Sequence, residues 1–246
     1  MHTLRDCLLN RIMKDCTMRK LLVTGLLALP FFAGCIQVEE TITLNADGSG
    51  TMELSYSVAE EQAAMMESAV SGEEALDAGE DFSFSADAIR QQFKEMEFEG
   101  VELLRADSSV QNGRRHISMA VKFNSLSALA ETPLLSERKV SLKKTGEGEY
   151  TFSQKANTAA ISPESGAEMA AFMQSMLQGL KVEIRVKAPG PITASNATET
   201  RGNEARWVFD IATNPNALSM IQNLDVQLSF KGDDEKLSGF REYGTK

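Results

Sequence analysis

The sequence predicts an α+β fold, in which a largely antiparallel sheet has helices packed on one face. Segments that alternate apolar and polar side chains, as half-buried strands do, come in blocks along the chain. Turn dipeptides such as Asn112-Gly113 join neighbouring segments of this kind, which favours hairpins. Segments with helical spacing lie between the blocks, and that arrangement is typical of α+β domains.

The individual elements follow from periodicity and from the turn residues between them. Strands are predicted at residues 36–44, 51–58, 101–108, 116–123, 138–144, 149–154, 181–187, 192–195, 205–211 and 226–230. Helices are predicted at residues 59–70, 85–96, 162–180 and 216–221. In the strand 181–187, Val182, Ile184 and Val186 are expected to point inward, whereas Lys181, Glu183, Arg185 and Lys187 are expected to point outward.

The longest predicted helix carries a continuous apolar stripe. Ser162 is a suitable N-cap, and Pro163 takes the first helical position. The stripe consists of Met169, Phe172, Met173, Met176, Leu177 and Leu180. One interpretation is a core face, since a helix that covers a sheet buries such a stripe. The other is a pliable lining for an acyl chain or another apolar ligand, because methionine side chains adapt to varied shapes.

The composition is that of a globular protein, with 42% apolar and 24% charged residues. The first 34 residues hold five of the 25 basic and two of the 35 acidic residues, so the remainder carries 20 against 33. Such an acidic chain is a poor partner for nucleic acid. Only Cys35 lies beyond residue 34, which excludes an intramolecular disulfide and a thiolate metal cluster there. No cofactor and no metal are expected.

An export signal precedes the predicted domain. Met18-Arg19-Lys20 gives a positive start, and residues 21–33 form an apolar stretch too short for a membrane-spanning helix. We expect residues 1–17 to be an upstream extension, residues 18–34 a signal peptide, residues 35–231 a single α+β ectodomain, and residues 232–246 a polar tail.

The end of this signal, Ala33-Gly34-Cys35, resembles a lipobox. In signals of that kind the cysteine thiol is joined to diacylglycerol, and cleavage leaves the cysteine as the first mature residue. Cys35 is therefore the predicted lipidation site, and the membrane is the predicted partner. Ile36, rather than Asp, follows the cysteine, which by resemblance to sorted Gram-negative lipoproteins favours the outer membrane.

Both ends of the predicted ectodomain carry a familiar pattern. Cys35 runs straight into a strand, an Asp-Gly turn and a second strand. Later come Val182–Ile192 with Pro-Gly-Pro, then Ser195-Asn196-Ala197, Gly202-Asn203 and the Trp207 strand. This pattern resembles the LppM-type bacterial lipoproteins, a group with a β-rich ectodomain behind a lipobox. The resemblance implies an envelope role with contact to lipids or glycolipids, and it implies no catalytic residues.

His116 is the residue to test first for catalysis. It lies beside Arg114 and Arg115 near a turn, where a surface histidine is the expected interpretation. Asp47-Gly48 lies in a turn without the carboxylates of a calcium loop, since Thr43 and Leu54 take the outer ligand positions. No glycine-rich phosphate loop and no zinc-ligand pair occur. A basic group consists of Arg138, Lys139, Lys143 and Lys144. One interpretation is an edge strand that lysines protect from pairing with another chain, and the other is an anionic headgroup site.

The sequence therefore predicts a lipid-anchored, non-enzymatic envelope lipoprotein. It would act as a binding or assembly module, with a lipid or an envelope protein as partner. The alternative is a carrier or sensor of a lipid or another apolar ligand, held by the Met169–Leu180 stripe.

Overall fold

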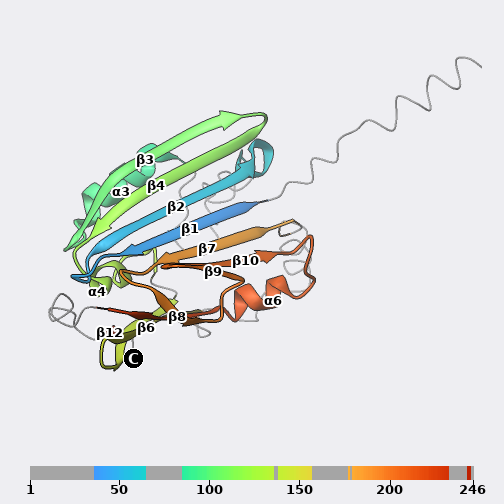
Figure 1. Ribbon diagram of the computed structural model, residues 1–246. Coiled ribbons are helices and arrows are strands. Elements are labelled where there is room, and N and C mark those ends of the chain that lie inside the picture. Colours follow the sequence, from blue (N-terminus) through green and yellow to red (C-terminus); the bar gives the residue numbers. More distant parts are fainter. Residues whose placement is uncertain are drawn as a thin grey trace, which may run out of the picture. The chain divides into compact units, whose positions relative to one another are not determined.

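Two β-sheets dominate the computed structural model, which describes residues 36–64, 85–135, 138–156, 177, 179–232 and 243–244 (Figure 1). The first sheet has seven strands in the order β3–β4–β2–β1–β7–β10–β9. Its strands are β1 (Gln37–Leu44), β2 (Gly50–Ala59), β3 (Val101–Gln111), β4 (Arg114–Phe123), β7 (Lys181–Lys187), β9 (Glu199–Arg201) and β10 (Glu204–Asp210). Neighbouring strands are antiparallel except β1 and β7, which run parallel.

The second sheet has five strands in the order β12–β5–β6–β11–β8. Its strands are β5 (Arg138–Gly146), β6 (Glu149–Ala156), β8 (Ile192–Ser195), β11 (Asp225–Lys231) and β12 (Tyr243–Gly244). All pairs in this sheet are antiparallel. β12 lies within the predicted polar tail, so the sheet extends beyond residue 231 and includes part of that tail.

Three helices whose bounds lie within the described residues pack against the strands. They are α3 (Ala86–Met96), α4 (Leu126–Ala130) and α6 (Ala217–Gln222). Ser85 caps α3 by accepting a hydrogen bond from the backbone of Ala88, as the sequence predicts. Helix α3 contacts β3 and β4, whereas α6 contacts β10. No described helix is long and apolar enough to cross a membrane.

The core is formed by alternate side chains of both sheets. Ile42 and Phe123 come from the first sheet, and Phe152 and Leu228 come from the second; all four are fully buried. Burial of each such side chain stabilises the fold by about 1.5–3 kcal/mol. Gly50 packs closely against β1 in this core. A Cβ at this position would lie 2.1 Å from the carbonyl oxygen of Thr43, so a larger residue would clash there.

Polar contacts also join the two sheets. Glu40 of β1 is 2% exposed and accepts hydrogen bonds from Arg138 and, at 3.0 Å, from the amide nitrogen of Gln154. Trp207 of β10 donates from its indole nitrogen to the side-chain oxygen of Asn196, 2.9 Å away, just beyond β8. Since an unpaired buried carboxylate is costly, Arg138 and Gln154 together stabilise the position of Glu40.

Two features differ from the predicted architecture. The chain forms two sheets rather than one, because β5, β6, β8 and β11 pair among themselves. The layer of helices on one face is not confirmed, since the described helices are short and contact different strands. Residues 60–64 are helical, as predicted for 59–70, and most of that helix and of the helix 162–180 lies outside the described residues.

Candidate functional site

A shallow pocket of about 220 Å³ lies on the outward face of the seven-stranded sheet. Its lining is rich in short hydroxyl side chains; it consists of Gln37, Glu39, Ser55, Tyr56, Ser57, Asp107, Ser108, Ser109, His116, Ile117 and Ser118. We call it the serine pocket. Serine side chains end one atom beyond Cβ, so where several stand side by side on a sheet the surface is lower than around them.

Strand register explains how the pocket forms. One row across four strands contains Asp107, Ser118, Ser55 and Glu39. Because directly opposite residues lie on the same face of a sheet, two serines stand between two exposed carboxylates.

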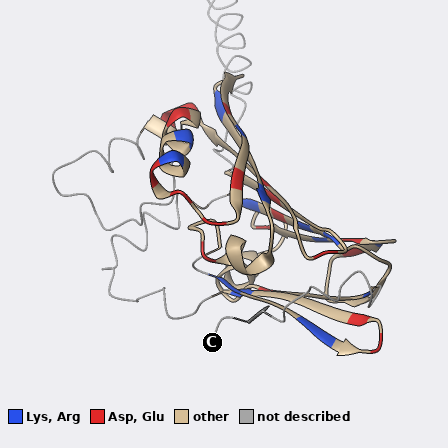
Figure 2. Ribbon diagram, turned by 90° about the vertical axis from the view of Figure 1, so that its left-hand side faces the viewer, with Lys and Arg blue, Asp and Glu red and all other residues tan. Residues whose placement is uncertain are grey.

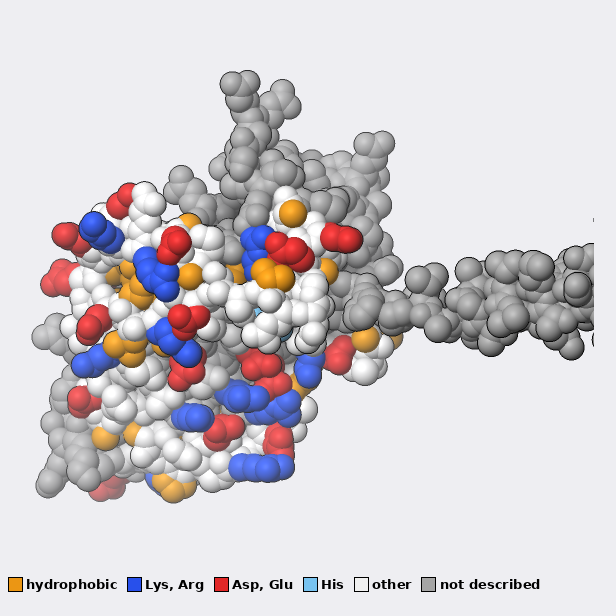
Figure 3. Space-filling view, turned by 90° about the horizontal axis from the view of Figure 1, so that it is seen from above, with side chains coloured by type: hydrophobic (Ala, Val, Ile, Leu, Met, Phe, Trp, Pro, Cys, Tyr) orange, Lys and Arg blue, Asp and Glu red, His pale blue; other side chains and the backbone are white. Residues whose placement is uncertain are grey.

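A second row lies one step closer to the start of β1. It contains Ser109, His116, Ser57 and Gln37. The His116 side chain is exposed and makes no hydrogen bond to the described side chains. Figure 3 shows pale blue histidine atoms amid the white atoms of uncharged polar side chains and backbone. No described side chain therefore selects one tautomer of the imidazole.

Two arginines precede His116 in β4, and only the first, Arg114, lies on the same face as His116 and contacts a residue of the pocket lining. Arg114 donates from Nε to the hydroxyl of Ser57 at 2.9 Å and from Nη2 to the backbone oxygen of Ser57 at 3.0 Å. Arg115 donates from Nε to one carboxylate oxygen of Glu60 at 3.1 Å and from Nη2 to the other at 2.5 Å, and these bonds hold the pKa of Glu60 below its ordinary value. Both guanidinium groups are therefore fixed by the protein.

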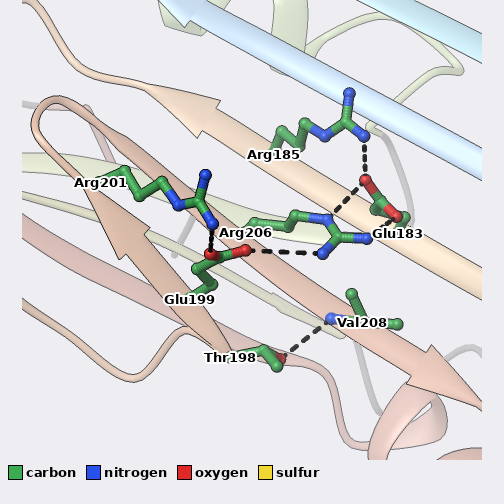
Figure 4. A network of polar contacts seen from close by, with 7 residues as sticks. All are labelled: Glu183, Arg185, Thr198, Glu199, Arg201, Arg206 and Val208. Carbon is green, nitrogen blue, oxygen red and sulfur yellow. Dashed lines mark hydrogen bonds and ion pairs between the residues drawn. The ribbon is translucent and has the colours of Figure 1, made fainter.

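A charged network on the same face belongs to the fold rather than to the pocket (Figure 4). Glu183 of β7 is 4% exposed and accepts bidentate hydrogen bonds from Arg206, at 2.8 and 2.6 Å. Arg185 adds an ion pair. The bonds from Arg206 lower the pKa of Glu183 below its ordinary value against the opposing effect of burial. Glu183 lies on the outward face, as predicted, opposite Glu39 of β1, but the two arginines cover it, so that it is buried.

Four of the six residues of the predicted apolar lining lie outside the described residues. Met169, Phe172, Met173 and Met176 are not described, Leu177 is half-buried in a turn, and Leu180 is 7% exposed just before β7. The carbonyl oxygen of Leu180 accepts from the backbone of Ile211. Cys35 also lies outside the described residues, one position before Ile36.

The predicted basic group is divided between the two faces of the five-stranded sheet. Arg138 is on the inward face, where it binds Glu40. Lys139 and Lys143 are exposed on the outward face, at positions that alternate with buried Val140 and Leu142.

The turn at Asp47 shows no feature of a calcium loop. The carboxylate of Asp47 accepts hydrogen bonds from the backbone nitrogen and the hydroxyl of Ser49 at 3.0 and 2.6 Å, and these bonds lower the pKa of Asp47.

Sequence reasoning singled out His116 but missed the serines around it. Ser55 and Ser57 alternate with the apolar positions of β2, and Ser118 does the same in β4. That alternation assigns them to the outward face. Their assembly depends on the register among β1, β2, β3 and β4, which the sequence does not display directly.

Similarity to known proteins was found among solved structures. No family model and no curated protein matches the chain. Among solved structures, the chain is similar to the NMR structure of the folded domain of LppM from Mycobacterium tuberculosis, with 13% identity and a TM-score of 0.41. The alignment covers 85% of this chain and 98% of that one. At this TM-score the similarity carries no conclusion about function.

Proposed function

We propose that this protein is a non-enzymatic, lipid-anchored binding module of the bacterial envelope, which holds a polyhydroxylated group in the serine pocket. The proposal joins two features: the lipobox-like sequence that ends at Cys35, and a polar pocket at the start of the strand that follows it.

The position of the pocket along β1 is the observation that carries the proposal. Gln37 lines the pocket and is the first residue of β1, two residues after Cys35. An extended chain of two residues spans at most about 7 Å. The chain is already paired with β7 at Ile36, whose carbonyl oxygen accepts a hydrogen bond from the backbone nitrogen of Lys181 at 2.9 Å. A lipid on Cys35 would therefore hold the pocket close to the membrane surface.

The chemistry of the lining indicates the kind of ligand. Glu39 and Asp107 accept hydrogen bonds, Gln37 both donates and accepts, and serine hydroxyls do both. Such a lining suits a ligand whose hydroxyl groups donate and accept in several directions. The exposed imidazole of His116 can add one further bond in either protonation state.

Blocking the pocket tests the proposal. Full-length protein would be purified from membranes in a mild detergent, and small molecules retained by it would be identified by mass spectrometry. Ser55→Arg places a long side chain in the middle of the pocket, so it should abolish retention of the ligand. Thr51→Arg, on the same face of the same strand and outside the pocket lining, is the control and should retain it.

Two outcomes would contradict the proposal. Equal retention by both variants would place the ligand elsewhere. Turnover of a retained ligand that stopped in His116→Ala would make the pocket an active site rather than a binding site.

A further inference from the structure

The outward face of the five-stranded sheet carries four lysines. Lys139 and Lys143 lie on β5, Lys155 lies on β6, and Lys231 lies on β11; all four are exposed. We call this surface the lysine face. In Figure 2 the lowest ribbons, which are the β5–β6 hairpin, show blue basic segments along the strands and red acidic ones at the turn.

The protein balances these positive charges only in part. Lys155 lies 3.5 Å from Asp225, which is itself half-exposed. Lys231 stands opposite Glu149 of β6 on the same face, although no ion pair joins them. Lys139 and Lys143 stand opposite Lys155 and Thr151 and make no ion pair with any described residue. The chain as a whole has a formal charge of −10. At physiological salt, exposed acidic residues farther than about 8 Å from these lysines are largely screened from them.

Between the lysines the surface is covered by hydroxyl groups. The hydroxyls of Ser141 and Ser153 are 2.8 Å apart, and those of Thr151 and Ser229 are also 2.8 Å apart. Each of these four side chains keeps further capacity to donate or accept, since a hydroxyl has one donor and two lone pairs. They alternate with buried apolar residues, so they all face outward.

The spacing of the lysines excludes a compact anion as their common ligand. Lys139 and Lys143 are four residues apart on β5, which is about 13 Å along an extended strand. Lys231 is two strands away from β5, or about 10 Å across the sheet. A single phosphate group contacts only cations within about 4 Å, whereas an extended chain with repeated negative charges can contact all of them in turn.

We propose that the lysine face binds an anionic polysaccharide that lies extended across β5, β6 and β11. The lysines contact the repeated acidic groups, and the serine and threonine hydroxyls between them contact sugar hydroxyls. This site is separate from the serine pocket and does not depend on the function proposed for that pocket.

A membrane surface fits these observations less well. Proteins that dock on a bilayer combine cations with apolar side chains that insert into it. Of the described residues, the large apolar side chains that are exposed are Met96, Leu104, Val110 and Met220, and none of them belongs to β5, β6 or β11.

Binding to dextran sulfate tests the proposal, with full-length protein purified in a mild detergent. The triple variant Lys139→Gln/Lys143→Gln/Lys231→Gln should bind about tenfold more weakly or worse, and its affinity should fall less steeply with salt, because fewer counterions are released. The control variant Lys122→Gln/Lys181→Gln/Lys187→Gln removes the same charge from the seven-stranded sheet and should bind as the wild type does. Neutral dextran should not bind to any of the three.

Three results would overturn the proposal. Equal weakening in both triple variants would mean that only net charge matters. Unchanged binding in the first variant would place the polyanion elsewhere. Binding of the wild type to phosphatidylglycerol vesicles but not to dextran sulfate would make the partner a membrane. Ser55→Arg, which closes the serine pocket, should leave dextran sulfate binding unchanged and so separates this site from that one.

Discussion

Glu183 and its two arginines are the best-defined electrostatic cluster of the described chain. The carboxylate accepts two hydrogen bonds from Arg206 and pairs with Arg185, which favours its ionised form. Conversely, Glu183 raises the pKa of Arg206. A folded-state pKa below the unfolded value stabilises the fold above the unfolded pKa, and this stabilisation is lost as pH falls through the folded pKa.

Glu183→Gln should therefore destabilise the protein at neutral pH by about 1–3 kcal/mol, because it removes a charged acceptor from two guanidinium groups. The difference from the wild type should shrink as pH falls below the ordinary glutamate pKa of about 4.3 and through the lowered pKa of Glu183. Urea unfolding at pH 7 and at lower pH values measures both effects. Glu53→Gln, an exposed carboxylate on the same face, should have little effect at either pH; a pH-independent cost at Glu183 would contradict the account.

Hairpin turns are the elements in which sequence and backbone agree most directly. Asn112 and Gly113 have φ values of +52° and +71°, which is the backbone that an Asn-Gly turn between twisted strands requires. The register continues through the turn, since Gln111 pairs with Arg114.

Gly113→Ala should cost about 1–2 kcal/mol, because a Cβ is disfavoured in the left-handed region even where it meets no other atom. Gly146→Ala is the matched control. A Cβ at Gly146 would lie at an ordinary 3.6 Å from the nearest atoms, without positive φ, so we expect a change within about 0.5 kcal/mol. Thermal unfolding of both variants measures the difference, and equal melting temperatures would show that the turn is not held as described.

The strands could be predicted from the sequence because alternation and turn residues are local signals. The predicted strand 181–187 is β7 without correction, and the hairpin β3–β4 differs only in length. Division into two sheets could not be predicted, since it depends on pairs such as β1 with β7 that are distant in sequence. The short strand β9 was missed because three residues give no recognisable alternation.

At the scale of the whole molecule, the candidate site is assembled from segments that no local pattern connects. His116 could be picked out as an isolated histidine, but the serine pocket needs the registers among four strands. The same holds for Glu40 and Arg138, which are 98 positions apart and meet between the sheets. The export signal and lipidation at Cys35 stay predictions; they could be made from the sequence because a lipobox-like segment is contiguous.

The central claim is that a lipid on Cys35 tethers this binding module to a membrane. Metabolic labelling with a labelled fatty acid tests it most directly, in cells that express the wild type or Cys35→Ala. The account predicts that label enters the wild-type protein, and that Cys35→Ala stays unlabelled and accumulates as the uncleaved precursor. Equal labelling of both proteins, or no labelling of the wild type, would contradict it.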